Sequence, residues 1–253
     1  MSFAQYPSLM DRTVFITGGG SGIGAAMVTA FAENGARVGF VDILTEPSQT
    51  LVATLAGSRH KPLFIPCDLT DIASLRAAIA RVHQELGPIG ALINNAANDE
   101  RHEVDAVTPE YWDRAMDVNL RHQFFAAQAV REQMKKLGFG SIVNLSSIAW
   151  MGGGTRMIAY SSAKAAVVGM THSLAREFGP DNIRVNAIAP GAVITEKQLR
   201  LWMTQAEADQ LAQKQCIRRR LEADEIARTA LFLAADDSQM ITKQCLTVDA
   251  GLR

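Results

Sequence analysis

Cysteine is scarce in this sequence, and long apolar runs are missing. The 253 residues include three cysteines, Cys67, Cys216 and Cys245, and no two of them lie close together. This odd number argues against a disulfide framework, so we expect buried, reduced thiols in a cytoplasmic protein. No apolar run approaches the ~20 residues that span a membrane. The N-terminal stretch MSFAQYPSLMDRT also lacks the basic and apolar parts of a signal peptide, so we expect neither secretion nor a membrane partner.

An excess of positive charge is missing as well. Lys and Arg number 25 and Asp and Glu 26, which gives a net charge of −1. A protein that binds nucleic acid usually concentrates basic residues on one face, so we expect no nucleic-acid partner. The cluster Arg218-Arg219-Arg220 is a local exception. A solvated or ion-paired loop explains it best, and a contact with phosphate or an acidic partner is the alternative. No spacing of His, Cys, Asp and Glu indicates a metal site.

Short apolar runs alternate with amphipathic stretches along the whole chain. We expect strands over residues 14–16, 38–41, 63–65, 91–93, 141–145, 184–188 and 245–248. We expect helices from Ala25 onward and over 72–86, 109–136, 159–178 and 222–235. This alternation predicts an α/β fold, a Rossmann-like, doubly wound parallel sheet of about seven strands with helices on both faces. No linker or repeat divides the chain, so we expect a single domain over 1–253, with a mobile substrate segment at about 191–220 that includes a helical stretch over the site.

A glycine-rich turn follows the first expected strand. The sequence TVFITGGGSGIG ends an apolar run at Thr17 and places Gly18, Gly22 and Gly24 before a helical pattern. Glycine permits positive φ and lets the backbone approach a phosphate, and a helix start offers free N–H groups. Strand, glycine turn and helix together predict a site for the pyrophosphate of a dinucleotide.

An acid ends the second expected strand. Asp42 lies eighteen residues after Gly24, where a dinucleotide fold places the carboxylate that binds the adenosine ribose. Such a carboxylate repels a 2′-phosphate, and no basic residue stands beside it, so we expect NAD as the cofactor rather than NADP. The alternative is an Asp that only forms a turn or caps a helix.

Tyr160 and Lys164 stand four residues apart in a helical stretch. That spacing puts them on one helix face, where an ammonium would stabilise a phenolate and lower the pKa of the tyrosine. Taken alone, a tyrosine and a lysine at this spacing are more often an exposed helix pair that matches the motif by chance. Here it follows a strand that ends at Ser147, thirteen residues earlier. Ligands bind at the carboxyl ends of parallel strands, so we expect these three side chains and the nicotinamide to converge.

With these motifs, the sequence resembles the short-chain dehydrogenase/reductase family over almost its whole length. The matching segments are TGGGSGIG (17–24), Asp42, Asp68-Leu69, NNAA (94–97), Asn119, NLSS (144–147), YSSAK (160–164), RVNAIAPG (184–191) and Thr195. The resemblance implies a catalytic tetrad of Asn119, Ser147, Tyr160 and Lys164. Tyr160 would be the acid/base, Ser147 would hold the reacting oxygen, Lys164 would bind the nicotinamide ribose, and Asn119 would hold a water for proton relay.

The resemblance also implies a set of cofactor-binding residues. These are Gly18, Ser21, Gly22, Ile23, Gly24, Asp42, Asp68, Leu69, Asn95, Ala96, Tyr160, Lys164, Pro190, Gly191, Val193 and Thr195. The chain departs from the family at Ala97, Lys243 and Ala250, where glycine is usual. We expect Ala97 to be tolerated, and the other two fall in the usual region of subunit contact. The family also implies a homotetramer in which the helices at 109–136 and 159–178 pack between subunits.

Within the family, the sequence is most similar to bacterial aldose 1-dehydrogenases for xylose, arabinose and galactose. The shared features are YPSL (6–9), the loop NAANDERH (95–102), VNLRH (118–122) and SSIAW (146–150). A sugar needs polar groups for its hydroxyls and an apolar surface for its C–H face. The candidate substrate residues are Asn98, Asp99, Arg101, His102, Ser147, Trp150 and Tyr160. A solvated loop is the alternative for Arg101 and His102, a ring packed in the core or at a subunit contact is the alternative for Trp150, and His122 fits a structural role better.

The resulting prediction is an NAD-dependent dehydrogenase that oxidises the anomeric carbon of a pentose or hexose to the aldonolactone. A 3-oxoacyl or small-alcohol reductase is the second interpretation, since the same tetrad serves it. A cofactor-binding regulator without catalysis is a third, and the intact tetrad argues against it. A hydrolase is not supported, because no G-x-S-x-G motif surrounds Ser147.

Overall fold

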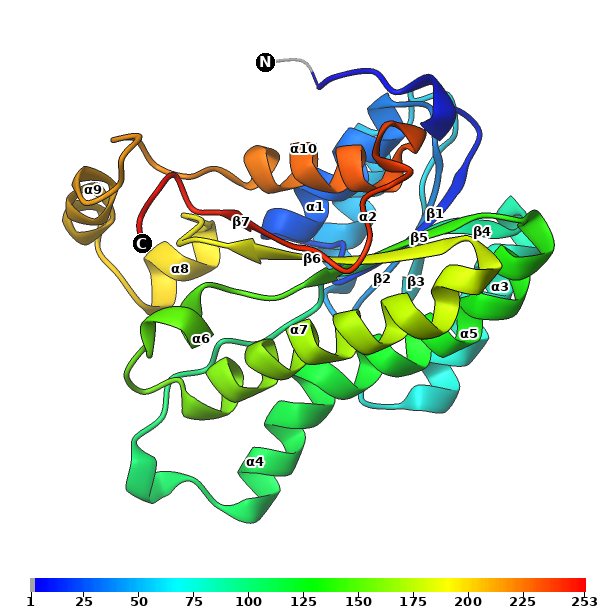
Figure 1. Ribbon diagram of the computed structural model, residues 1–253. Coiled ribbons are helices and arrows are strands. Elements are labelled where there is room, and N and C mark those ends of the chain that lie inside the picture. The colour runs from blue at the N-terminus through cyan, green and yellow to red at the C-terminus, as the bar shows by residue number, and fades with distance from the viewer. Residues whose placement is uncertain (1–2) are drawn as a thin grey trace.

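The computed structural model describes residues 3–253 and contains one seven-stranded parallel sheet (Figure 1). Its strands are β1 (Thr13–Thr17), β2 (Arg37–Asp42), β3 (Leu63–Pro66), β4 (Ile89–Asn94), β5 (Gly140–Leu145), β6 (Ile183–Pro190) and β7 (Cys245–Val248). Their order is β3-β2-β1-β4-β5-β6-β7, so the chain winds outward from β1 in one direction and then returns beside it as β4. The predicted sheet is confirmed, and the gap between the ends of β1 and β4 is the switch point where such folds bind ligands.

Helices cover both faces of the sheet. They are α1 (Gly22–Glu33), α2 (Thr45–Thr54), α3 (Ile72–Leu86), α4 (Pro109–Met116), α5 (His122–Leu137), α6 (Ala149–Gly152), α7 (Ile158–Phe178), α8 (Glu196–Leu201), α9 (Gln205–Gln213) and α10 (Ala223–Ala234). Helices α1, α2 and α10 lie on one face and α3, α5 and α7 on the other, while α6, α8 and α9 lie near the carboxyl ends of the strands (Figure 1).

The alternation of β1 explains these two layers. Val14 and Ile16 belong to the apolar core under α1 and α10, and Phe15 belongs to the core under α3, α5 and α7. Successive residues of a strand point to opposite faces of the sheet. Since helices cover both faces, all three side chains are fully buried. A continuous apolar run is therefore what a strand covered on both faces requires.

Two helical expectations are corrected by the structure. The helix predicted over 109–136 is interrupted by a π-helical segment at Asp117–Arg121, which separates α4 from α5. Helix α2 was not predicted at all. Its sequence TEPSQTLVAT has no clear apolar stripe, and Ser48 is its one buried residue, so hydrophobic periodicity gives no signal there.

The cysteines and the arginine cluster have mixed outcomes. Cys67 is buried as expected and Cys245 is partly buried, but Cys216 is exposed, and all three are free thiols.

Arg219 pairs with Glu225 and Arg220 pairs with Asp209, so the ion-paired interpretation of the cluster is confirmed for these two residues. Within residues 3–253, no helix is long and apolar enough to cross a membrane.

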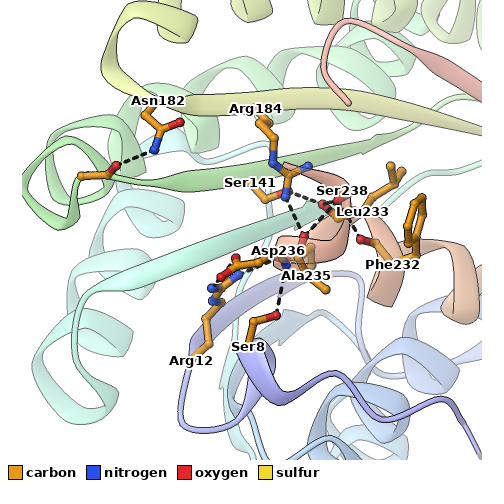
Figure 2. Close-up of polar contacts among 12 residues, drawn as sticks. Ser8, Arg12, Ser141, Asn182, Arg184, Phe232, Leu233, Ala235, Asp236 and Ser238 are labelled. Atoms are coloured by element: carbon orange, nitrogen blue, oxygen red, sulfur yellow. Dashed lines mark hydrogen bonds and ion pairs between the residues drawn. The ribbon is translucent and has the colours of Figure 1, made fainter. Parts of the chain in front are cut away.

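A polar network lies at the amino ends of β5 and β6 (Figure 2). Ser141 donates to the carbonyl of Leu233 at 2.8 Å, and Arg184 donates to the carbonyl of Ala235 at 3.1 Å. Arg12 donates to the carbonyl of Ala234 and pairs with Asp236, both at 2.8 Å. These donors satisfy carbonyls at the end of α10 that the helix itself leaves unpaired. The network therefore fixes the end of α10 against the sheet, at the edge farthest from the candidate site.

Candidate active site at the carboxyl edge of the sheet

The turn between β1 and α1 is held open by its glycines. Gly18 and Gly22 have φ of +66° and +52°, the left-handed region that favours glycine. At Gly24 a Cβ would lie 1.8 Å from the carbonyl oxygen of Gly18, so the turn closes only with a hydrogen there. The N–H groups of Gly18 and Gly19 bond to the carbonyl of Val41 on β2, which ties the turn to the sheet. The first N–H groups of α1 then face the edge where a phosphate can approach.

Asp42, at the end of β2, is buried and holds the same turn. Its Oδ2 accepts from the N–H of Gly20 at 2.8 Å, and its Oδ1 accepts from the N–H of Leu44 at 2.9 Å. Asp42 therefore does make the backbone contacts of the alternative interpretation, an Asp that forms a turn. Each carboxylate oxygen keeps further lone-pair capacity, so these bonds leave acceptors for ribose hydroxyls.

The chain after β4 supports the turn from the other side. The side chain of Asn95 donates to the carbonyls of Thr17 and Gly18 at 3.1 and 2.8 Å, and the backbone N–H of Ala96 donates to Thr17 Oγ1. His122 is fully buried and lies 3.2 Å from the carbonyl of Ala96, which confirms its structural role. The amide of Asn95 is therefore engaged with the turn, and the segment lines the cofactor edge through its backbone.

The remaining cofactor candidates lie at the ends of β3 and β6. Asp68 is exposed and accepts from the N–H of Thr70, and Leu69 packs partly buried beside it. Gly191, next to Pro190, approaches the Cα of Asp249 so closely that a Cβ would lie 2.7 Å away. Val193 pairs with Leu221 in a short bridge.

Thr195 lies across from the glycine turn. A Cβ built on Gly22 would lie 3.3 Å from Thr195 Cγ2, and the hydroxyl of Thr195 caps α8 by accepting from Gln198 N. The segment after β6 therefore closes over the turn after β1. Ser21 immediately precedes α1 and Ile23 is the second residue of that helix; the Ser21 side chain makes no capping bond to α1 within the described chain.

The expected catalytic side chains converge beyond the end of β5. Tyr160 and Lys164 lie on one face of α7, with the Nζ of Lys164 5.6 Å from the centre of the Tyr160 ring. Ser147, two residues after β5, makes a side-chain hydrogen bond with Tyr160. Lys164 is almost fully buried and donates to the carbonyl of Leu145 at 2.7 Å. Helix α7 thus carries the phenol of Tyr160 and the amine of Lys164, and the segment after β5 carries the hydroxyl of Ser147.

The electrostatics of this cluster differ from the sequence-based expectation. Burial raises the pKa of Tyr160 to about 12, and the hydrogen bond from Ser147 offsets this only in part. Burial also lowers the pKa of Lys164 to about 7, against the opposing effect of Asp99. The prediction that the lysine lowers the pKa of the tyrosine is therefore wrong for the chain by itself. Exclusion of water disfavours the phenolate of Tyr160 and the ammonium of Lys164 alike.

Asn119 occupies the π-helical segment and is buried. Its Oδ1 accepts from the N–H of Asn98 at 2.9 Å, and its Nδ2 donates to the carbonyls of Asn98 and Ala115. Single π-helical turns are frequent at functional sites, because they reposition side chains along a helix. Here the irregular turn brings Asn119 against the loop that leaves β4.

That loop is the polar loop, residues 98–102, and α8 is bonded to it. Asp99 Oδ1 accepts from Lys197 Nζ at 2.9 Å, and Asp99 Oδ2 accepts from Gln198 Nε2 at 2.6 Å. Burial opposes the ionisation of Asp99, but these two bonds outweigh it and lower the pKa of the carboxyl. Lys197 and Gln198 were not predicted, since the sequence indicated a polar helical stretch without singling out a residue of it.

The other substrate candidates have distinct environments. The Arg101 guanidinium lies 5.5 Å from the centre of the Trp202 ring, and Trp202 was not predicted. His102 is buried and lies 3.0 Å from the hydroxyl of Tyr111, so its alternative of a solvated loop is wrong. Trp150 is 36% exposed on α6, which argues against the alternative of a packed core ring.

The three departures from glycine are also located. Ala97 is exposed, so its methyl group meets no obstacle in the described chain. Lys243 and Ala250 have φ of +62° and +56°, a conformation that glycine adopts without strain.

These residues fit a bound dinucleotide. The turn after β1 is a cradle that a side chain at Gly24 would fill, and the buried carboxylate of Asp42 ends the neighbouring strand. The segments after β4 and β6 flank that cradle through Ala96 and Thr195, and Tyr160 with Lys164 lies at the same edge of the sheet.

Comparisons with known proteins identify relatives over the full chain. Residues 18–253 match the family described as enoyl-(acyl carrier protein) reductase. The chain is 49% identical to the probable galactose dehydrogenase GalD of Rhizobium meliloti (strain 1021), with 98% of each chain covered. It is 45% identical to the D-xylose 1-dehydrogenase of Caulobacter vibrioides (strain NA1000 / CB15N), with both chains covered completely. The crystal structure of 3-oxoacyl-[acyl-carrier protein] reductase from Brucella melitensis ATCC 23457 superimposes with a TM-score of 0.89 at 32% identity, covering 98% of this chain and 93% of that one.

Proposed function

Since the chain belongs to the short-chain dehydrogenase/reductase family, an oxidoreductase family that acts on CH–OH groups with a nicotinamide cofactor, we propose that it is an NAD-dependent aldose 1-dehydrogenase. The observation that carries this proposal is the full-length identity of 45–49% to enzymes named for galactose and D-xylose. The polar loop supports it, because Asn98, Asp99, Arg101 and His102 give it hydrogen-bonding side chains of the kind that a sugar requires.

In the proposed reaction, Tyr160 removes the proton of the C1 hydroxyl of the sugar. Ser147, which already bonds to Tyr160, holds the same oxygen as it becomes the lactone carbonyl. When bound, the oxidised nicotinamide supplies a positive charge and accepts the hydride that leaves C1. Lys164 holds ribose hydroxyls, and Asn119 completes the tetrad as the anchor of a water for proton relay. The protein contributes mainly the position and the protonation state of its base.

The NAD preference in this proposal rests on Asp42. Its carboxylate is buried at the end of β2, beside the glycine turn, and no Lys or Arg adjoins it in sequence. A second negative charge from a 2′-phosphate would therefore meet repulsion without a compensating cation. The other cofactor residues of the proposal are those at the ends of β1, β3, β4 and β6 described above.

We propose the same one-domain organisation over residues 1–253, with the segment at about 191–220 moving over the substrate. We also propose a cytoplasmic homotetramer in which α5 and α7 pack between subunits. Phe124 on α5 and Ile158 on α7 are 40% and 41% exposed, and subunit contact would cover such apolar side chains. Sedimentation of the purified protein tests this assembly, and a monomer at micromolar concentration would contradict it.

The direct test of function is the formation of reduced cofactor with a panel of aldoses, with NAD and NADP run in parallel. We expect turnover of one or two sugars, a clear preference for NAD, and a lactone as the first product. The matched control is Tyr160→Phe, which removes the acid/base and should lower kcat by about 10²–10⁴-fold while cofactor binding remains. If no aldose is oxidised but another alcohol or ketone is turned over, the sugar assignment is overturned and the assignment as a dehydrogenase stands.

A 3-oxoacyl reductase is the second candidate. Its support is the structural similarity to the Brucella melitensis enzyme of that name, at a lower identity than that of the sugar dehydrogenases. An acyl chain needs an apolar channel, which the polar side chains of the loop at 98–102 do not favour. NADPH-dependent reduction of a 3-oxoacyl thioester in the same assay would favour this candidate.

A further inference from the structure

Two buried hydrogen-bond donors without acceptors lie side by side at the rim of the proposed site. The Nε of Arg101 and the Nε1 of Trp202 are both shielded from solvent, and neither has a hydrogen-bond partner within residues 3–253. The guanidinium lies 5.5 Å from the centre of the indole ring. Buried polar groups are almost always hydrogen-bonded, so two neighbouring exceptions indicate acceptor atoms that a ligand brings.

Both residues belong to segments that are bonded to each other through Asp99. Arg101 is part of the polar loop, and its positive charge opposes the burial that raises the pKa of Tyr160. Trp202 directly follows α8, the helix that Lys197 and Gln198 fasten to Asp99. The bonds of Lys197 and Gln198 to Asp99 therefore hold the two segments together without using the N–H groups of Arg101 and Trp202.

The chemistry of the pair defines what it can bind. A guanidinium and an indole N–H are donors without acceptor atoms, so their ligand must present oxygen lone pairs. Arg101 lies over one face of the indole, so a sugar ring would pack against the opposite, apolar face. A neutral hydroxyl group next to C–H atoms satisfies both requirements.

We propose that Arg101 and Trp202 form a specificity subsite, in which their Nε–H and Nε1–H groups donate to one hydroxyl oxygen of the aldose away from C1. This inference rests on the proposed aldose dehydrogenase function. It assigns to Trp202 a substrate contact that selects among sugars. A site built to bond a particular hydroxyl rejects an analogue that lacks it, because the buried donors are then left unpaired.

The test compares Trp202→Phe with the unchanged protein on the best aldose and on its 2-, 3- and 4-deoxy analogues. Phenylalanine keeps the aromatic ring and removes the N–H. For the parent sugar we expect kcat/KM of the variant to fall about 10-fold, mainly through KM, since the hydroxyl is bonded in both ground and transition states. For one deoxy analogue the two proteins should agree within about twofold, because the bonding partner is already missing.

Two further variants complete the design. Arg101→Lys keeps the positive charge but removes the Nε–H, and it should lose discrimination at the same hydroxyl. Trp112→Phe, the same substitution in α4, should leave the ratios between sugars unchanged. An equal loss on every sugar, or no loss with Trp202→Phe, would show a merely structural contact and overturn the subsite. Better turnover of a sugar phosphate or uronic acid than of the neutral sugar would also overturn it.

The experiment separates this inference from the function on which it rests. If the unchanged protein oxidises an aldose, and the unchanged protein and Trp202→Phe discriminate equally among the deoxy sugars, only the subsite fails. If the unchanged protein oxidises no aldose, the proposed function fails, and the subsite fails with it.

Discussion

Replacing Lys164 with methionine should stabilise the fold at acidic pH while abolishing activity. Lys164 is about 1% exposed, and burial lowers its pKa from 10.5 to about 7. The folded protein therefore disfavours the ammonium form that the unfolded chain prefers. Methionine has a similar length and no charge, so it removes this penalty together with the side chain that the catalytic cluster needs.

The magnitude follows from the protonation equilibrium. A tenfold change in such an equilibrium is worth about 1.4 kcal/mol, so keeping Lys164 charged in the folded protein costs about 5 kcal/mol. The substitution also removes the 2.7 Å bond to the carbonyl of Leu145, and an unpaired buried carbonyl costs about 1–3 kcal/mol. Below pH 7 both folded and unfolded chains are protonated, the full penalty applies, and the variant should be more stable by about 2–4 kcal/mol.

The sign should reverse at alkaline pH. Between about pH 7 and 10.5 the unfolded chain binds a proton that the folded one does not, so the stability of the unchanged protein rises with pH. Near pH 10 its penalty is almost gone, and Lys164→Met retains only the loss of the hydrogen bond to Leu145. The variant should then be less stable than the unchanged protein.

Urea unfolding at about pH 6 and about pH 10, at one protein concentration, measures this crossover. Lys136→Met on the exposed surface of α5 is the matched control and should show no crossover. A variant destabilised equally at both pH values would refute the reasoning, because it would mean that Lys164 is buried without electrostatic penalty.

Three other changes test separate parts of the structure. Gly24→Ala would place a methyl group 1.8 Å from the carbonyl oxygen of Gly18, so we expect loss of dinucleotide binding in titration calorimetry; unchanged affinity would contradict the proposed turn. Ser141→Ala removes the donor to the Leu233 carbonyl and should lower the free energy of unfolding by about 1–3 kcal/mol without changing kcat. Lys243→Gly relieves a φ of +62°, so it should raise the thermal midpoint and increase the free energy of unfolding by about 0.5–1 kcal/mol once the entropy cost of glycine is subtracted; a lower midpoint would count against strain there.

The sheet was predictable because its signals are local. Strands such as β1 and β5 are short apolar runs that end at polar residues, and α3 begins after Asp71, whose side chain accepts from the N–H groups of Ala73 and Ser74. Helix α2 escaped prediction because it buries little. The break at Asp117–Arg121 escaped it because a π-helical turn depends on contacts of Asn119 with the distant loop at Asn98.

The site shows the same division. Tyr160 and Lys164 were predictable from helical spacing, and the glycine turn from its place after a strand. Their protonation was not, because burial of both groups arises from segments far away in the chain. The partners Lys197 and Trp202 carry no motif, and only the folded contact with Asp99 and Arg101 distinguishes them from the other polar and aromatic residues of their segment.

The bonds of Asp42 have a consequence for protein engineering. A chemist who wishes the enzyme to accept a 2′-phosphate would first replace this carboxylate with a smaller or basic side chain. That change would also remove the acceptor for the N–H of Gly20, inside the glycine turn, and for the N–H of Leu44. The proposed cofactor preference and the geometry of the turn are therefore coupled through one side chain. A redesign that keeps this turn therefore needs another acceptor for the N–H of Gly20.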